Sequence, residues 1–386
     1  MTADQAAAER VQAIFECNFV RGAEIGASVA VWQNGARALC FCSGWMDAAK
    51  SMPWTEKTMV LVWSATKGLS SACLLHALER RGLGLSTRVS EFWPAFAQGG
   101  KGEITVGEVA SHRAGLSALT DKTATIDDRE AIVRAIEAQE PLWASRHAHG
   151  YSPRTYGYLA DEFVRRLAGK PLGEYWRENF AEPMELDLWI GLPEALHHRA
   201  AQMIAARAMC GDIEDDFSQA MATPGSLTRE AFSTPAGAMS PSAMNSPAMR
   251  SASLPSLGAI GSADSLAKFY AMLSLGGVWE GCRYFSPETI QWMTKPLAQG
   301  IDKTLRTETA FAAGFMLDPL DDFGRKKRRM FGPSISAFGH PGAGGSLAFA
   351  DPENHLGFAY VMNQMESGVL PKSRATALVQ ALYDLP

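Results

Sequence analysis

The residue types best suited to chemistry in this chain are a serine and a lysine three positions apart, in the stretch Ser64-Ala65-Thr66-Lys67. Apolar residues that recur at helical spacing predict a helix over 68–81, and this spacing stacks Lys67 under Ser64 on one helix face. An amine in that position can take the serine proton. The apolar run over 59–63 would bury the pair, and burial shifts a lysine toward the neutral form that accepts a proton. Free N–H groups at the helix start would stabilise negative charge near Ser64.

This four-residue pattern is short. A serine that caps a helix, followed by a lysine on the surface, gives the same sequence. Its interpretation therefore depends on the elements around it and on whether other reactive side chains accompany it.

Segments near both ends of the chain predict the strands of one antiparallel sheet. Asn34-Gly35 lies between two strand-like segments and indicates a hairpin, because Asn-Gly readily adopts the positive φ of such a turn. The expected strands are 27–32, 36–42, 338–351 and 356–362, and the expected flanking helices are 5–20 and 372–383. The sequence thus predicts an α+β fold with an antiparallel sheet formed from both chain ends and flanked by helices.

The middle of the chain predicts a mostly helical lobe inserted into this sheet, with its clearest helices over 130–137 and 156–167. A length of 386 residues fits one large domain. We expect a single catalytic domain over 1–386, with a sheet lobe over about 1–65 and 256–386, a helical lobe over about 66–208, and a covering loop over about 209–255.

The segment over 209–255 is rich in Ala, Met, Ser and Pro and has little periodicity. A loop of that length without regular structure is either disordered or a functional cover. Its methionines, among them Met239, Met244 and Met249, would suit the lining of a broad acyl pocket.

Composition narrows the classes of function. The hydrophobic fraction of 47% indicates a globular protein, and the net charge of −5 with a pI near 6.0 gives no electrostatic footprint for nucleic acid. The basic run over 325–329 lies beside Asp318, Asp321 and Asp322, and we interpret it as a solvated hairpin tip. The sequence shows neither a signal-like N-terminus nor an apolar stretch long enough to span a bilayer, so we expect a cytoplasmic protein without membrane association.

Cysteine and histidine spacing gives no metal or disulfide pattern. The six cysteines are scattered and lack Cys-x-x-Cys spacing, so we expect reduced thiols. The pairs His147 with His149 and His197 with His198 lack a third ligand at useful spacing. We therefore expect neither a metal nor another cofactor.

Two further motifs accompany Ser64 and Lys67: one over 149–157, ahead of a helix, and one over 338–346, which enters a strand. Together and in this order they resemble the serine beta-lactamase and penicillin-binding protein superfamily, and more narrowly the class C-type esterases called family VIII carboxylesterases. The resemblance runs from about Ile25 to the C-terminus and includes the segments 104–108 and 111–116.

The resemblance implies roles for particular residues. Ser64 matches the nucleophile, Lys67 its partner and Tyr151 the tyrosine that opens the second motif. The stretch His340-Pro341-Gly342 occupies the place of the third motif. The oxyanion would bind between the N–H groups of Ser64 and Ala343, each worth on the order of 10²–10³ in rate. The acylation base is left open between Lys67 and Tyr151.

Small residues over 342–344 would form an edge strand against which a substrate can lie. The departures from the lactamase pattern are Pro153, where that family has an asparagine amide, and His340, where it has a lysine. These positions hold the side-chain amide and carboxylate of a lactam, which an ordinary ester does not need. His340 is left open between a structural or substrate-wall role and direct participation.

The sequence therefore predicts a serine hydrolase that cleaves small-molecule carboxylic esters of short or medium acyl chain through an acyl-enzyme on Ser64. A beta-lactamase, a D-amino-acid peptidase or amide hydrolase, and an acyltransferase share this chemistry and stay open. A catalytically silent relative that acts as a binding protein is the alternative from another class. Gly-x-Ser-x-Gly is absent from the sequence, so the α/β-hydrolase nucleophile elbow has no candidate.

Overall fold

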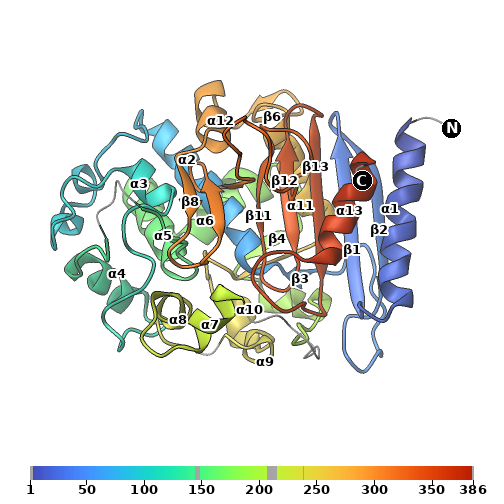
Figure 1. Cartoon of the computed structure of the whole chain (residues 1–386), viewed down its shortest axis with the longest axis horizontal. Helices are drawn as coiled ribbons and strands as arrows, with labels where there is room; N and C mark the ends of the chain where they lie inside the picture. The colour runs from blue at the N-terminus through green and yellow to red at the C-terminus, as the bar shows by residue number, and fades with distance from the viewer. Residues whose placement is uncertain (1–2, 144–147, 207–214, 238, 385–386) are drawn as a thin grey trace.

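The computed structural model describes residues 3–143, 148–206, 215–237 and 239–384. Within these residues, both ends of the chain build an eight-stranded antiparallel sheet in the order β2-β1-β13-β12-β11-β10-β9-β8 (Figure 1). Its strands are β1 (Gly26–Gln33), β2 (Ala36–Gly44), β8 (Ala298–Ile301), β9 (Glu308–Phe311), β10 (Met316–Leu317), β11 (Phe338–Pro341), β12 (Leu347–Asp351) and β13 (Leu356–Met362). The expectation of an α+β fold with a sheet from both chain ends is confirmed.

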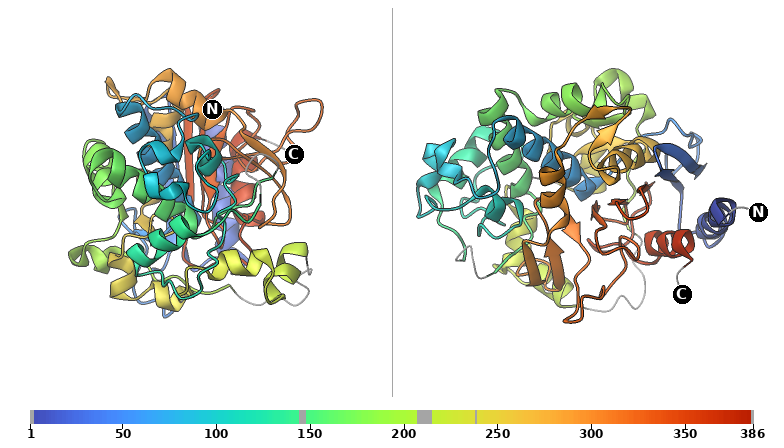
Figure 2. Two further views of the ribbon diagram at one scale, coloured as in Figure 1. Left: turned by 90° about the vertical axis from the view of Figure 1, so that its left-hand side faces the viewer. Right: turned by 90° about the horizontal axis from the view of Figure 1, so that it is seen from above.

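Helices cover both faces of this sheet. Helices α1 (Ala3–Val20) and α13 (Ser373–Tyr383) pack side by side on one face, as the view from above in Figure 2 shows. Helix α11 (Ala263–Ser274) packs against β13 and β1 from the other face. Strand β13 is therefore buried along its whole length.

A mostly helical region packs beside the sheet. Its centre is α2 (Thr66–Arg80), which is buried from Thr66 to Leu78 and packs against α5 (Thr155–Ala168) and α6 (Leu172–Trp176). The other helices and strands here and at its border are α3 (Val106–Ala110), α4 (Arg129–Ala138), α12 (Pro287–Thr294), β3 (Val60–Leu61), β4 (Leu188–Ile190), β5 (Ala259–Gly261), β6 (Val278–Trp279) and β7 (Cys282–Arg283). Short 3₁₀ turns cover Trp63–Ala65, Val89–Glu91, Pro94–Ala97 and Glu194–Arg199, and a π turn covers Arg177–Ala181.

Two predictions for the sheet, one hairpin turn and one strand, had different outcomes. The Asn34-Gly35 hairpin is confirmed, since both residues have positive φ, 52° and 79°, between β1 and β2. The single strand expected over 338–351 is wrong: β11 and β12 form a hairpin there. The chain reverses at Gly344 and Gly345, whose φ values of 81° and 118° favour glycine. Strand β11 also pairs with β10, so it is an interior strand of the sheet. The segment over 342–344 belongs to the turn that joins β11 to β12 and is not an edge strand.

The segment expected as a covering loop contains short helices in its described part. These are α7 (Asp216–Ala222), α8 (Leu227–Ser233), α9 (Pro241–Met244) and α10 (Pro247–Ser251). Each begins at a serine or aspartate whose side chain accepts a hydrogen bond from a backbone N–H of the first turn, and α9 and α10 have proline at their start. The apolar spacing of this segment did not predict these helices, whereas their capping residues are visible in the sequence.

The basic run over 325–329 is only partly solvated. The side chain of Lys326 is buried and pairs with the buried Asp318 at 3.0 Å, and Arg328 contacts the same carboxylate at 3.4 Å. Arg325 is exposed and pairs with Asp321. The interpretation of the whole run as a solvated tip is therefore wrong, because Asp318 requires buried charge partners. In the described part of the chain, no helix is long and apolar enough to cross a membrane.

Candidate active site

Ser64 lies in the 3₁₀ turn Trp63–Ala65, which leads directly into α2. Trp63 adopts a φ of 50°, a left-handed conformation that costs a non-glycine residue roughly 1–3 kcal/mol and persists where the surroundings impose it. The Trp63 ring is buried, and the Trp63 carbonyl accepts a hydrogen bond from Thr66 Oγ1 at 2.6 Å. The same Thr66 oxygen accepts the N–H of Ala259 at 2.9 Å, which ties the turn to β5. Packing therefore fixes the position of Ser64.

Lys67 is fully buried, with its Nζ 3.5 Å from Ser64 Oγ. The Nζ donates to two backbone carbonyls, Pro153 O at 2.8 Å and Ser256 O at 2.9 Å. No acidic side chain of the described residues forms an ion pair with it, and burial lowers the pKa of the Lys67 amine well below its usual range. A neutral amine has two N–H groups for the two carbonyls and one lone pair left for the Ser64 proton.

Tyr151 lies beside this pair. Lys67 Nζ is 4.8 Å from the centre of the Tyr151 ring, which also stacks on Phe311 at 6.1 Å. The Tyr151 hydroxyl is buried, and no well-formed hydrogen bond joins it to another described group. Burial raises the pKa of this phenol, while the nearby Ser64 hydroxyl lowers that pKa in part. Tyr151 therefore remains protonated and able to donate toward Ser64.

His340 comes from β11 and is buried. Its Nδ1 lies 2.7 Å from Pro341 O, a carbonyl that can only accept, so Nδ1 carries the proton and Nε2 is an acceptor. Nε2 has no partner within the described part of the chain. Burial lowers the pKa of His340 to about 3. His340 is thus a neutral acceptor, unlike a lysine at the same place.

The turn after β11 packs closely on the nucleophile turn. A Cβ placed on Gly342 would lie 2.2 Å from the carbonyl oxygen of Val62, so only glycine fits there. The N–H of the next residue, Ala343, has no hydrogen-bond partner among the described residues. Gly342 and Ala343 therefore place a strand-end backbone against the turn that carries Ser64.

A small cavity of about 30 Å³ joins these groups. Four of the residues proposed from the sequence line it: Ser64, Tyr151, His340 and Ala343. Its other walls are Phe232, Leu305, Met316, Pro341, Val369 and Leu370. The structure thus brings together three segments that are far apart in the chain. The methionines expected to line a pocket, Met239, Met244 and Met249, lie against the core instead.

Two positioning residues were missed from the sequence. Asp302, in the turn between β8 and β9, is fully buried and accepts the Tyr151 N–H with both carboxylate oxygens at 3.0 Å. Ser256, just before β5, holds Lys67 through its carbonyl and the start of α5 through its hydroxyl, which accepts the Gly157 N–H at 2.6 Å. Neither residue belongs to a local motif, so sequence spacing carried no signal for them.

Two other buried histidines, His112 and His149, contact residues of the motif region or of the sheet. The His112 Nδ1 accepts the Ser152 N–H at 3.2 Å, and its ring packs on Tyr151. The His149 Nε2 lies 2.8 Å from Thr309 Oγ1. His147 lies outside the described residues. Among the residues with described placement, no group of three or more His, Cys, Asp or Glu side chains could hold a metal ion.

Comparisons with known proteins agree with this geometry. The family described as "Beta-lactamase" matches residues 4–383. The esterase/beta-lactamase LipL of Mycobacterium tuberculosis (strain ATCC 25618 / H37Rv) is 29% identical over 372 residues, which are 91% of this chain and 80% of that protein. A penicillin-binding protein homologue from Caulobacter crescentus has a TM-score of 0.85 at 34% identity, covering 98% of this chain and 97% of the other. The crystal structure of a family VIII carboxylesterase has a TM-score of 0.86 at 30% identity, with the same coverage.

Proposed function

This chain belongs to the beta-lactamase family and is an esterase-like serine hydrolase, and we propose that it cleaves neutral carboxylic esters of short or medium acyl chain through an acyl-enzyme on Ser64. The observation that carries this proposal is the position of Lys67 Nζ, fully buried and 3.5 Å from Ser64 Oγ. The proposed substrate class is a small-molecule ester.

Acylation starts from the neutral forms of both flanking groups. Lys67 Nζ takes the proton of Ser64 as Oγ attacks the ester carbonyl carbon. The carbon–oxygen bond to the alcohol breaks, the leaving oxygen takes the Tyr151 hydroxyl proton, and Lys67 returns a proton to Tyr151. This assigns the base role to Lys67 and the acid role to Tyr151, because burial lowers the lysine pKa and raises the tyrosine pKa.

Two backbone N–H groups are proposed to hold the oxyanion, those of Ser64 and Ala343. The close packing of Gly342 on Val62 supports this assignment, because it brings the turn after β11 against the nucleophile turn. Water then attacks the acyl carbonyl and gives its proton to the Lys67 and Tyr151 pair, and Ser64 recovers its own proton as the acid leaves. The net reaction consumes one ester and one water and gives one acid and one alcohol.

His340 favours neutral esters over lactams. A lysine in the third motif would offer a positive charge to a substrate carboxylate, whereas the lone pair of His340 Nε2 repels one. Proline has no side-chain amide, so Pro153 cannot bind the side-chain amide of a lactam as an asparagine would, and its backbone carbonyl already accepts a hydrogen bond from Lys67. Both features support an ester as the substrate.

The direct test is a p-nitrophenyl acetate assay on the wild type and on Ser64→Ala, with circular dichroism to confirm the fold. The wild type should turn over the ester and label at Ser64 with a fluorophosphonate, and Ser64→Ala should do neither. Turnover that survives in Ser64→Ala contradicts the nucleophile. A wild type without turnover and without label supports the non-catalytic alternative. A cephalosporin assay run in parallel tests lactam hydrolysis.

A further inference from the structure

A second, much larger cavity of about 690 Å³ lies next to the Ser64 cavity. The two cavities share three lining residues, Leu305, Val369 and Leu370. These side chains therefore form the partition between the space at the nucleophile and the larger cavity. Small-molecule sites in proteins typically measure ~300–1,000 Å³, whereas ~30 Å³ holds no more than about two waters or a very small group.

The two sides of the partition are built differently. Leu305 is buried and held in place, because its N–H and that of Thr304 both donate to Asp302 Oδ1 at 2.8 Å. Val369 and Leu370 are half-buried in the irregular segment between β13 and α13. That segment touches the turn after β11, where the Gly344 N–H donates to Gly368 O at 3.3 Å.

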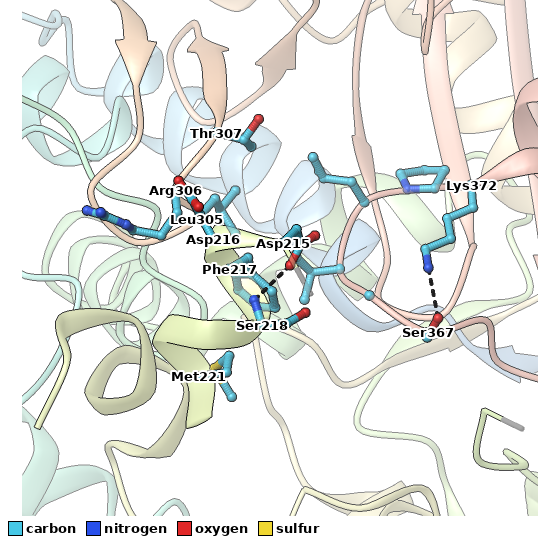
Figure 3. Close-up of a pocket in the computed structure, with 14 residues that line it drawn as sticks. Asp215, Asp216, Phe217, Ser218, Met221, Leu305, Arg306, Thr307, Ser367 and Lys372 are labelled. Atoms are coloured by element: carbon cyan, nitrogen blue, oxygen red, sulfur yellow. Dashed lines mark hydrogen bonds between the residues drawn. The ribbon is translucent and has the colours of Figure 1, made fainter. Parts of the chain in front are cut away.

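The described lining of the larger cavity combines apolar side chains with polar and charged ones. Phe217 and Met221 of α7 add apolar surface to that of the partition, as Figure 3 shows. Its described lining carries two acidic and two basic side chains, Asp215, Asp216, Arg306 and Lys372. Lys372 Nζ donates to Ser367 Oγ at 2.8 Å, and Asp215 accepts the Ser218 N–H at 2.8 Å (Figure 3). These four charges sum to zero, so the described lining has no net charge that would select an ionic group, and the apolar side chains Phe217, Met221, Leu305, Val369 and Leu370 offer contacts to a hydrocarbon chain.

We propose that the larger cavity is the subsite for the apolar chain of the ester and that Leu305, Val369 and Leu370 limit how far a chain bound at Ser64 extends into it. This inference rests on the proposed esterase function. Short chains fit without displacing the partition, and each further carbon must pass between Leu305 on one side and Val369 with Leu370 on the other.

The test measures kcat/KM for p-nitrophenyl acetate and octanoate in the wild type and in the double variant Val369→Ala, Leu370→Ala. A second ester series holds the acyl group as acetate and lengthens the alcohol. The octanoate to acetate ratio, or the matching ratio in the alcohol series, should rise on the order of tenfold in the double variant, since pocket methylenes change kcat/KM about 10–200-fold. The series that responds identifies which half of the ester enters the subsite.

Two further variants complete the design. Met221→Trp adds volume to the larger cavity from α7, and Met221 does not line the Ser64 cavity, so this variant should lower the ratio of long-chain to acetate kcat/KM. Ile335→Ala removes a similar apolar side chain at an exposed site outside both cavities and should change neither ratio. If the ratios of long-chain to acetate kcat/KM are unchanged in both the double variant and Met221→Trp, the inference is overturned. If the wild type does not turn over p-nitrophenyl acetate at all, the proposed function is overturned instead.

Discussion

Asp302 holds the backbone of Tyr151, with both carboxylate oxygens 3.0 Å from the Tyr151 nitrogen. The same carboxylate accepts the N–H of Leu305, so it connects the tyrosine to the partition of the substrate cavity. This buried turn helps to place a phenol from the segment before α5 beside a serine in the 3₁₀ turn before α2.

Replacement of Asp302 should reduce catalysis rather than substrate binding. Hydrogen bonds to charged groups contribute about 1.5–3 kcal/mol, so Asp302→Asn should lower kcat roughly tenfold or more. KM for p-nitrophenyl acetate should change little, because Asp302 does not line the Ser64 cavity and an acetyl group does not need to displace the partition that Asp302 holds through Leu305. Asp351→Asn is a matched control, a fully buried carboxylate that accepts from Ser334 and Tyr383 at the end of β12. Equal kcat losses in the two variants would show that Asp302 acts only through stability.

The pH profile should report the Lys67 amine. Burial lowers its pKa, so the proton-accepting form predominates above the lowered pKa and is lost as pH falls through it. We expect kcat/KM for p-nitrophenyl acetate to fall on the acid side, with an apparent pKa below the usual 10.4 or so of lysine. Lys67→Arg keeps a charge that does not deprotonate, and it should lower kcat by about 10²–10⁴. Substantial activity in Lys67→Arg would remove lysine from the base role.

Near neutral pH, titration of His340 should not contribute to the acid limb of this profile, the fall of kcat/KM at low pH. Burial holds its pKa at about 3, so the side chain is uncharged over the working range. In His340→Asn the position of the acid limb should be unchanged. A shift of the limb in this variant would contradict the neutral-acceptor assignment.

His340→Lys should change the charge preference of the site. The carboxylate of the substrate favours the protonated form of a lysine at this position and is attracted by it, so the ratio of kcat/KM for a carboxylate-bearing ester over its neutral methyl ester should rise by about tenfold, as 1.4 kcal/mol of new attraction requires. The measurement is this ratio in the wild type and the variant. An unchanged ratio would place the His340 side chain out of reach of the substrate.

Gly342→Ala should abolish most of the activity. The added Cβ would meet Val62 O at 2.2 Å and push the Ala343 N–H away from Ser64. Loss of one oxyanion donor lowers kcat by about 10²–10³. Gly102→Ala is the control, because its Cβ would meet only an ordinary contact of 3.8 Å. Comparable activity in both variants would exclude Ala343 from the oxyanion site.

Local sequence patterns predicted much of the fold. The Asn34-Gly35 turn and the apolar helix after Ser64 are short-range features, governed by backbone preference and by periodicity within a few residues. The strand predicted over 338–351 was wrong, because local patterns do not show at which glycines the chain reverses. The reversal at Gly344 and Gly345 divides this segment into β11 and β12. The helices between 216 and 251 were missed because their signal lies in capping residues rather than in apolar spacing.

By itself, the sequence determined which side chains could react: Ser64 and Lys67 by their spacing on one helix, and Tyr151 and His340 by their motifs. Only the tertiary structure decided the protonation states of these groups, the carbonyls of Pro153 and Ser256 that hold Lys67, and the role of Asp302. The physical reason is that burial and long-range hydrogen bonds depend on segments far apart in the chain. Desolvation then sets which group can accept a proton and which can donate one.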